Sequence, residues 1–307
     1  MKNKVVVGTR GSRLALVQTE MVVARLREGN PLLDISTVEI VTAGDRDRHS
    51  PLEQLGVNVF VKELEEALLD GRIDLAVHSL KDLPTEMPAG LGILAVTERA
   101  DPRDVLVAGK RLEELPAGAR IGTDSMRRSL QLGSCRPDLV VLSIRGNVDT
   151  RLRKVETGEV DGVILAAAGI KRLGSAGSIT QYLPLEYFLP AVGQGALAIE
   201  GRLDDRETAE IVAAMTHLPT WQSVAAERAF LFTLGGGCRA PIAALGSVDQ
   251  GILRLEGMVG GVKSKKVLRC SEEGGAGSPE ELGILLARRL LDMGASELIA
   301  EAGIENR

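Results

Sequence analysis

The sequence predicts an α/β protein: two α/β units resembling each other, followed by a smaller α+β region. Three observations indicate this class. Short β-branched runs alternate with segments of helical periodicity, a pattern typical of a parallel sheet. A pattern of strand, Gly-Thr, polar turn and helix occurs twice, and the composition of the chain changes after residue 217. With about 100–200 residues per domain, 307 residues suggest two or three domains.

The first unit begins with a strand at 4–7, which ends before Gly8. Ser12 is a candidate N-cap of the helix that follows. Apolar residues then recur at spacings of three and four and predict one buried face: Leu14, Val17, Met21 and Ala24. The further elements expected in this unit are a strand at 38–41, a helix over 60–68 that ends near Gly71, and a strand at 73–77.

The second unit repeats this pattern, because residues 120–130 echo residues 7–14. Further strands are expected at 139–144 and 163–165, and the segment from 190 to about 215 could return to the first unit. Prolines 102 and 190 are plausible boundary points. The predicted domains are therefore 1–98 with 195–216, 99–194, and 217–307.

The third region is expected to begin with a helix over 221–234 and a glycine-rich stretch at 235–241. Strands at 252–259 and 266–270 follow. Ser278, Pro279 and Glu281 predict a helix start with a cap, a first-turn proline and a capping-box glutamate. The apolar face of this helix is predicted to comprise Leu282, Leu285, Leu286 and Met293.

Composition argues against several classes of protein. A net charge of −5 and only seven aromatic residues disfavour a nucleic-acid binder, which needs a basic face and stacking platforms. No apolar run reaches membrane-spanning length, and the N-terminus has no signal-peptide pattern. Three widely spaced cysteines fit neither a disulfide framework nor a zinc site, and no metal-ligand spacing is present. A reduced, cytoplasmic enzyme is expected.

Basic side chains follow nearly every predicted strand of the first two units. Ligands of open α/β sheets bind at the carboxyl ends of strands, where helix N-termini add N–H donors. Arginine, at 27 residues against 10 lysines, forms flat bidentate pairs with carboxylates. The arginine excess could also reflect genome composition, but so many sites in register predict a polyanion-binding cleft. The cations are Arg10, Lys81, Arg127, Arg128, Arg145, Arg151, Lys171 and Arg172.

Three other residues allow two interpretations each. Asp82, among these cations, either balances charge in a salt bridge or stabilises a cation formed during a reaction. His78 lies in an apolar strand pattern, which favours a packing role over a catalytic base. Cys238 is either structural or a reactive thiol whose pKa Arg239 could lower, whereas Cys135 and Cys270 are expected to be structural.

Seven stretches in the same order resemble the porphobilinogen deaminase (hydroxymethylbilane synthase) family and cover nearly the whole chain. Among them are GTRGSRLAL at 8–16 and HSLKDLP within 74–84. The set is highly specific, although no single stretch would be. The other matching stretches lie at 60–65, 145–151, 165–172, 189–196 and 236–241.

The resemblance implies three domains, the first two like a periplasmic binding protein around a cleft. It also implies a monomeric transferase of tetrapyrrole and heme biosynthesis that condenses four porphobilinogens onto a dipyrromethane cofactor, joined by a thioether to Cys238. Asp82 matches the catalytic aspartate. Residues implied to bind the cofactor are Lys81, Ser125, Arg127, Arg128, Arg145 and Asn147. Those implied to bind substrate are Arg10, Ser12, Gln18, Arg151, Arg172 and Gln194.

The implied chemistry agrees with the charges read from the sequence. Each pyrrole unit carries two carboxylates, so the growing chain is a polyanion, and loss of ammonia leaves a cation that a carboxylate can stabilise. One region departs from the family: two lysines common before residue 60 are missing, and Ala43 stands where an arginine is common. The competing hypothesis is a two-lobed anion-binding protein without enzymatic activity.

Overall fold

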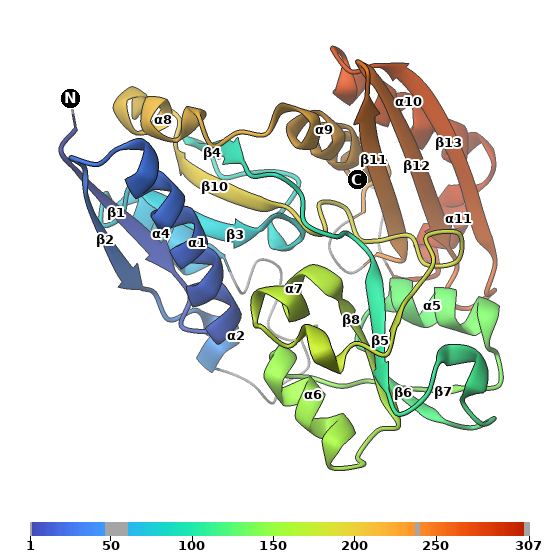
Figure 1. Cartoon of the computed structure of the whole chain (residues 1–307). Coiled ribbons are helices and arrows are strands. Elements are labelled where there is room, and N and C mark those ends of the chain that lie inside the picture. The colour runs from blue at the N-terminus through green and yellow to red at the C-terminus, as the bar shows by residue number, and fades with distance from the viewer. Residues whose placement is uncertain (1, 47–60, 237–239, 304–307) are drawn as a thin grey trace. The chain divides into compact units, whose positions relative to one another are not determined.

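Figure 1 shows the computed structural model of the chain, which describes residues 2–46, 61–236 and 240–303. Its contacts divide the chain into two compact units. The first unit comprises Met1–Arg99 and Ala196–Trp221, and the second comprises Ala100–Gly195 and Gln222–Arg307. The last segment thus shares a unit with Ala100–Gly195. That residues 217–307 form a separate domain stays a prediction.

The first unit contains a five-stranded mixed sheet with the order β2-β1-β3-β10-β4. Strands β2, β1 and β3 are parallel, whereas β10 is antiparallel to both β3 and β4. The expectation of a parallel sheet therefore holds only for the first three strands, because β10 reaches this sheet from the opposite direction after the second unit. The strands are β1 (Lys4–Thr9), β2 (Asp34–Glu39), β3 (Leu75–Ser79), β4 (Leu91–Val96) and β10 (Leu197–Arg202).

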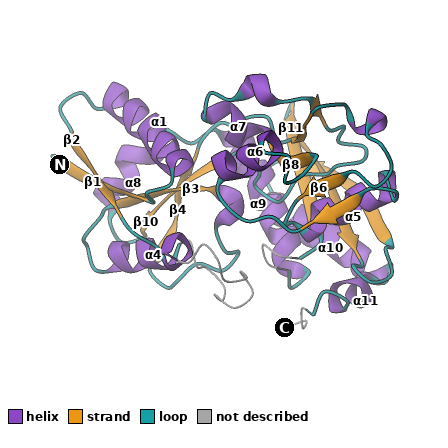
Figure 2. Cartoon of the chain, turned by 90° about the horizontal axis from the view of Figure 1, so that it is seen from below, coloured by secondary structure: helices purple, strands orange, loops and turns teal. Residues whose placement is uncertain are grey.

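Helices α1 and α4 cover opposite faces of this sheet (Figure 2). Side chains of β3 alternate between the two faces: Leu75 and Val77 pack with α1, and Ala76 packs with α4. Helix α4 ends near Gly71, as predicted, where the backbone φ is +69°. The helices of this unit are α1 (Arg13–Gly29), α2 (Ala43–Arg46), η1 (Leu80–Asp82), α4 (Lys62–Leu69) and α8 (Arg206–Ala213), and α9 (Leu218–Thr233) begins in it.

Two predictions for the first unit are wrong in detail. The buried face of α1 includes Gln18, Val22 and Leu26, whereas Met21 and Ala24 are exposed. The spacing of apolar residues predicted the wrong face because two polar residues, Gln18 and Thr19, are buried. Both form side-chain hydrogen bonds. Strand β2 begins four residues before the predicted 38–41, since Asp34 is in register with Lys4.

The second unit contains another five-stranded mixed sheet, with the order β7-β6-β8-β5-β9. It repeats the first arrangement: three parallel strands are followed by one that runs antiparallel to its neighbour. The strands are β5 (Asp104–Ala108), β6 (Arg120–Gly122), β7 (Val140–Leu142), β8 (Gly162–Ala166) and β9 (Gln181–Tyr182). The helices are α5 (Met126–Cys135), α6 (Val148–Glu156), α7 (Ala167–Arg172), η2 (Leu112–Glu114) and η3 (Ala176–Ser178).

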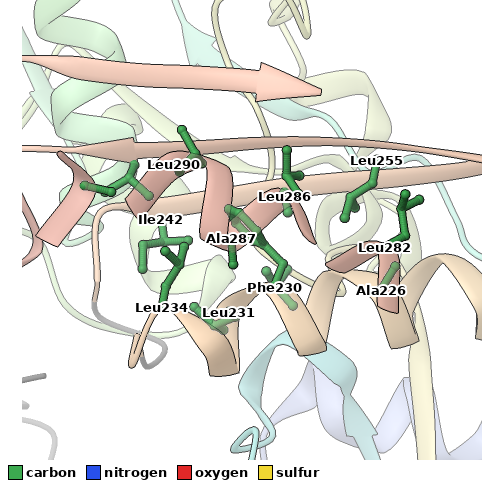
Figure 3. Close-up of a cluster of buried hydrophobic side chains, with 14 of the residues drawn as sticks. Ala226, Phe230, Leu231, Leu234, Ile242, Leu255, Leu282, Leu286, Ala287 and Leu290 are labelled. Atoms are coloured by element: carbon green, nitrogen blue, oxygen red, sulfur yellow. The ribbon is translucent and has the colours of Figure 1, made fainter. Parts of the chain in front are cut away.

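The rest of this unit is an antiparallel sheet, β11-β12-β13, packed against helices. Its buried cluster joins Phe230 of α9, Leu255 of β12 and Leu286 of α10 (Figure 3). Strand β11 is absent from the sequence-based expectation. The remaining elements are β11 (Ile242–Asp249), β12 (Ile252–Gly260), β13 (Val267–Gly275), α10 (Pro279–Asp292) and α11 (Ala295–Ala300).

Helix α10 starts as predicted, with Ser278 at the N-cap position and Pro279 in the first turn. The Ser278 side chain makes no capping hydrogen bond, so the predicted capping box does not form. Leu282 and Leu286 are buried, but Leu285 and Met293 are about half exposed, at 53% and 47%. The true apolar face continues through Leu290 instead. Within the described parts of the chain, no helix is both long enough and apolar enough to cross a membrane.

Candidate active site

The turn after β3 carries Asp82, the predicted catalytic carboxylate. The Leu80 N–H donates to Ala196 O at 3.1 Å, and the Leu83 N–H donates to Leu80 O at 3.1 Å. These bonds hold the single turn η1 at the end of the sheet. Asp82 is exposed there and Lys81 is half-buried. The backbone therefore presents the Asp82 carboxylate to solvent rather than to the core.

The start of α1 lies at the same edge of the first sheet, because β1 and β3 are parallel neighbours. Ser12 caps α1 as predicted, its hydroxyl accepting from the Ala15 N–H at 3.4 Å. Arg10 is half-buried. Gln18 is buried, and its amide nitrogen donates to Ser79 Oγ at 2.9 Å. Gln18 thus links α1 to the last residue of β3, directly before the Asp82 turn.

The corresponding position of the second unit holds two buried arginines at the start of α5. Ser125 caps this helix, accepting from the Arg128 N–H at 3.4 Å. Arg127 Nη1 donates to Leu189 O at 2.6 Å, and Arg128 Nη1 donates to Ile164 O at 3.0 Å. Hydrogen bonds to backbone carbonyl oxygens from distant parts of the chain therefore fix both guanidinium groups.

Asp104, which the sequence analysis missed, joins these two arginines. It is fully buried and accepts from Arg127 Nη1 at 2.7 Å and Arg128 Nη2 at 2.7 Å. Burial alone would raise the pKa of Asp104, but the two positive charges hold it well below its ordinary value. Gln194 is buried too, and its amide nitrogen donates to Asp104 Oδ1 at 2.9 Å and Pro102 O at 2.7 Å. The signal available in the sequence was a charged residue directly before the apolar run 105–108.

Three other predicted arginines of this unit, Arg145, Arg151 and Arg172, form no ion pair with an acid in the described part of the chain. Arg145 Nη1 and Arg172 Nε are buried without a hydrogen-bond partner among the described residues. Burial, followed by repulsion from Arg128, lowers the pKa of Arg151 to about 10; Asp124 opposes this shift and Arg145 adds a smaller repulsion. Burial also lowers the pKa of Arg172 to about 10.

Two of these arginines donate to uncharged backbone carbonyl oxygens, which do not balance their positive charge. Arg151 Nε donates to Gly146 O at 2.8 Å, and Arg172 Nη2 donates to Gly195 O at 2.7 Å. Asn147 is exposed at the N-cap of α6, and its side chain makes no capping bond. The second unit therefore holds a positive cluster that an anion would stabilise.

Cys238 and Arg239 lie outside the described residues, as does the segment at 47–60 with its missing lysines. The chain enters the cysteine segment from α9 and leaves it into β11. Leu231 and Leu234 on one side and Ile242 on the other belong to one buried cluster (Figure 3). Both ends of the segment are thus attached to the core of the second unit.

The three residues expected to be structural, His78, Cys135 and Cys270, are buried or partly buried. His78 is buried in β3, with Nε2 at 2.9 Å from Glu200 Oε2. Burial raises the pKa of the Cys135 and Cys270 thiols, which disfavours reactive thiolates. In the described parts of the chain no three His, Cys, Asp or Glu side chains form a group that could hold a metal ion.

Comparisons with known proteins match nearly the whole chain to one family. Residues 5–210 match the family model described as porphobilinogen deaminase, dipyromethane cofactor binding domain, and residues 221–292 match that family's C-terminal domain. The porphobilinogen deaminase of Desulforudis audaxviator is 50% identical and covers 98% of each chain. That of Syntrophus aciditrophicus is 49% identical, over 95% of this chain and 97% of the relative.

Solved structures with a similar backbone include a methionine binding protein, MetQ, at a TM-score of 0.44 and 14% identity. The match covers 72% of this chain and 91% of that one.

Proposed function

Since the chain belongs to the porphobilinogen deaminase family, we propose that it condenses four porphobilinogen molecules, releasing one ammonia each time. The condensation takes place on a covalently bound dipyrromethane, and hydrolysis then releases hydroxymethylbilane. The arginine cluster of the second unit carries this proposal. Its members are partly or fully buried, and Arg128 and Arg145 repel Arg151. Arg145 Nη1 and Arg172 Nε have no acceptor among the described residues. Acetate and propionate groups supply the missing negative charge and acceptors.

The second unit's residues fit the cofactor. The orphaned Arg145 Nη1 and the fixed Arg128 guanidinium are suited to carboxylates, and the Cys238 thiol is the proposed thioether anchor. When bound, the dipyrromethane supplies the free pyrrole carbon to which substrate is added. The residues proposed to hold it are Cys238, Lys81, Ser125, Arg127, Arg128, Arg145 and Asn147. Those proposed for the substrate and growing chain are Arg10, Ser12, Gln18, Arg151, Arg172 and Gln194.

Asp82 is proposed as the catalytic residue. Its turn presents an exposed carboxylate close to Lys81 in the sequence and at the end of a buried strand. A fixed negative charge stabilises the positive charge that develops on porphobilinogen as ammonia leaves. The same carboxylate accepts hydrogen bonds from the pyrrole N–H and so orients the ring.

The competing hypothesis, an anion-binding protein without activity, has no support among the curated relatives, which are named as enzymes. We further propose that the protein works as a cytoplasmic monomer with porphobilinogen as its partner and no nucleic acid. Sedimentation at working concentration checks the monomer, and fractionation of the source cells checks the compartment.

Intact-protein mass tests the proposed function directly. The purified protein should be heavier than its sequence by two linked pyrrole units, and it should convert porphobilinogen to hydroxymethylbilane with ammonia release. Cys238→Ser should lose both the extra mass and the turnover. Cys135→Ala is the matched control and should keep both. A wild-type protein of bare sequence mass that turns over no porphobilinogen contradicts the proposal.

A further inference from the structure

Three ionisable side chains are buried together in the first unit: Glu65 of α4, His78 of β3 and Glu200 of β10. Their exposed fractions are 5%, 5% and 0%. His78 Nε2 lies 2.9 Å from Glu200 Oε2. In the β3–β10 ladder, Glu200 is in register with Ala76, which packs with α4 on one face of the sheet. His78, two residues further, shares that face.

The oxygens of this group have few donors. Glu65 Oε1, His78 Nε2 and both Glu200 carboxylate oxygens are buried without a hydrogen-bond partner in the described chain. The 2.9 Å contact between His78 Nε2 and Glu200 Oε2 is therefore close enough for an ion pair but does not have the geometry of a hydrogen bond. A buried charge is unfavourable unless it is paired or its group takes up a proton. Burial, followed by repulsion from Glu200, raises the pKa of Glu65 to about 7, and His78 opposes this shift while Glu66 adds to it.

The other ionisable side chains on α4 and on the strands packed against it bind elsewhere or are exposed. Arg202 of β10 donates to the carbonyl oxygens of Leu68 and Ile73 and to Asp74. Lys4 of β1 is exposed, and β4 carries no ionisable side chain. Glu63 of α4 accepts from the Ala43 N–H through Oε1. The charge balance around Glu65 therefore depends on His78, Glu200 and Glu66.

We propose that Glu65, His78 and Glu200 form one electrostatically coupled group that positions the turn carrying Lys81 and Asp82. A proton on Glu65 removes one negative charge from this buried group. Loss of that proton adds a carboxylate charge beside the Glu200 carboxyl group. Their repulsion acts between α4 and β10, the two elements that hold the carboxylates.

The backbone connects this group to the turn. Strand β3 runs from His78 through Ser79 directly into η1, and Ser79 is in register with Leu197 of β10. The Leu80 N–H bond to Ala196 O extends the same ladder by one step. A shift of β10 relative to α4 is thus transmitted to the Asp82 turn. Glu65 is thus a positioning residue. The expected effect on turnover rests on the proposed function, whereas the buried group itself does not.

Glu65→Gln tests the proposal, with Glu66→Gln as the matched control one residue along the helix, where the side chain is exposed. Infrared spectra of the folded cofactor-loaded protein should show a carbonyl band of a protonated carboxyl group that disappears as the pH rises through about 7. Glu65→Gln should lack this band and Glu66→Gln should keep it. This readout does not depend on turnover.

Kinetics supply the second measurement. Wild-type kcat should fall on the alkaline side through one ionisation, while KM for porphobilinogen stays within about twofold. Glu65→Gln should keep its kcat over that range. Glu66→Gln should keep the alkaline fall in kcat, moved to a slightly lower pH because the small repulsion from Glu66 is removed.

An absent band in the wild type, or a band that survives Glu65→Gln, overturns the proposal, as does an unchanged alkaline limb in Glu65→Gln. If Glu65→Gln does not fold, the wild-type infrared titration alone decides. A protein that shows the band but no porphobilinogen turnover contradicts the proposed function and leaves the proposed coupled group intact.

Discussion

Asp104 Oδ1 accepts two hydrogen bonds from Arg128, from Nη2 at 2.7 Å and from Nε at 3.1 Å, in a fully buried position. Two bonds to one oxygen set the plane of the guanidinium group, and the Arg128 Nη1 bond to Ile164 O completes its orientation. Asp104 also balances the charge of Arg127. The orientation of this arginine pair therefore depends on a residue that is not itself predicted to touch a ligand.

Asp104→Asn should abolish cofactor retention. The change removes one negative charge from beneath two buried arginines, and truncating one partner of such a pair costs about 2–5 kcal/mol. We expect a lower melting temperature and an intact mass without the two pyrrole units. Asp161→Asn is the control, because it breaks an aspartate–arginine pair of the same unit that is about 40% exposed. A cofactor-loaded Asp104→Asn protein would contradict this role.

Asp82→Asn should nearly stop turnover while leaving the fold intact. Asp82 is exposed, so its replacement removes no buried contact, whereas one preorganised charge contributes about 10²–10³ in rate. The checks are kcat, the melting temperature and the intact mass, which should keep the cofactor. Asp70→Asn, an exposed change at the far end of α4, is the control. If Asp82→Asn retains more than about a tenth of the wild-type rate, Asp82 only balances charge.

The active-site ends of the strands could be predicted from sequence because local signals are strong there. Ser12 caps its helix as predicted, and Ser125, in the stretch that echoes the first unit, caps α5 in the same way. The antiparallel strand β10 was not predictable in the same way, because its partners β3 and β4 lie over a hundred residues away in the chain. Asp104 was missed for a related reason: its partners come from α5 and from Gln194.

Glu65 should make the stability of the protein depend on pH. Its pKa is about 7 in the folded protein against an ordinary 4.5, so the folded state binds more protons between these values. The stabilisation is complete below about pH 4.5 and is lost as the pH rises through about 7, amounting to about 1–3 kcal/mol. Glu65→Gln should therefore raise the melting temperature relative to wild type at about pH 8 more than at about pH 5. Equal differences at both values would contradict the raised pKa.

Two helical glycines should respond in opposite ways to alanine. In α10, a Cβ on Gly283 would lie 2.2 Å from Ala226 O and 2.9 Å from Phe230 N, both backbone atoms of α9. Neither can move without separating α9 from α10, so Gly283→Ala should destabilise the protein by about 1–3 kcal/mol. In α5, a Cβ on Gly133 would meet nothing within 4 Å, and alanine is the better helix former by about 1 kcal/mol. Gly133→Ala should therefore stabilise the protein. The midpoints of denaturant unfolding curves with equal m-values give the sign of the stability change for each variant. A stabilised Gly283→Ala would show that α9 and α10 do not pack this closely.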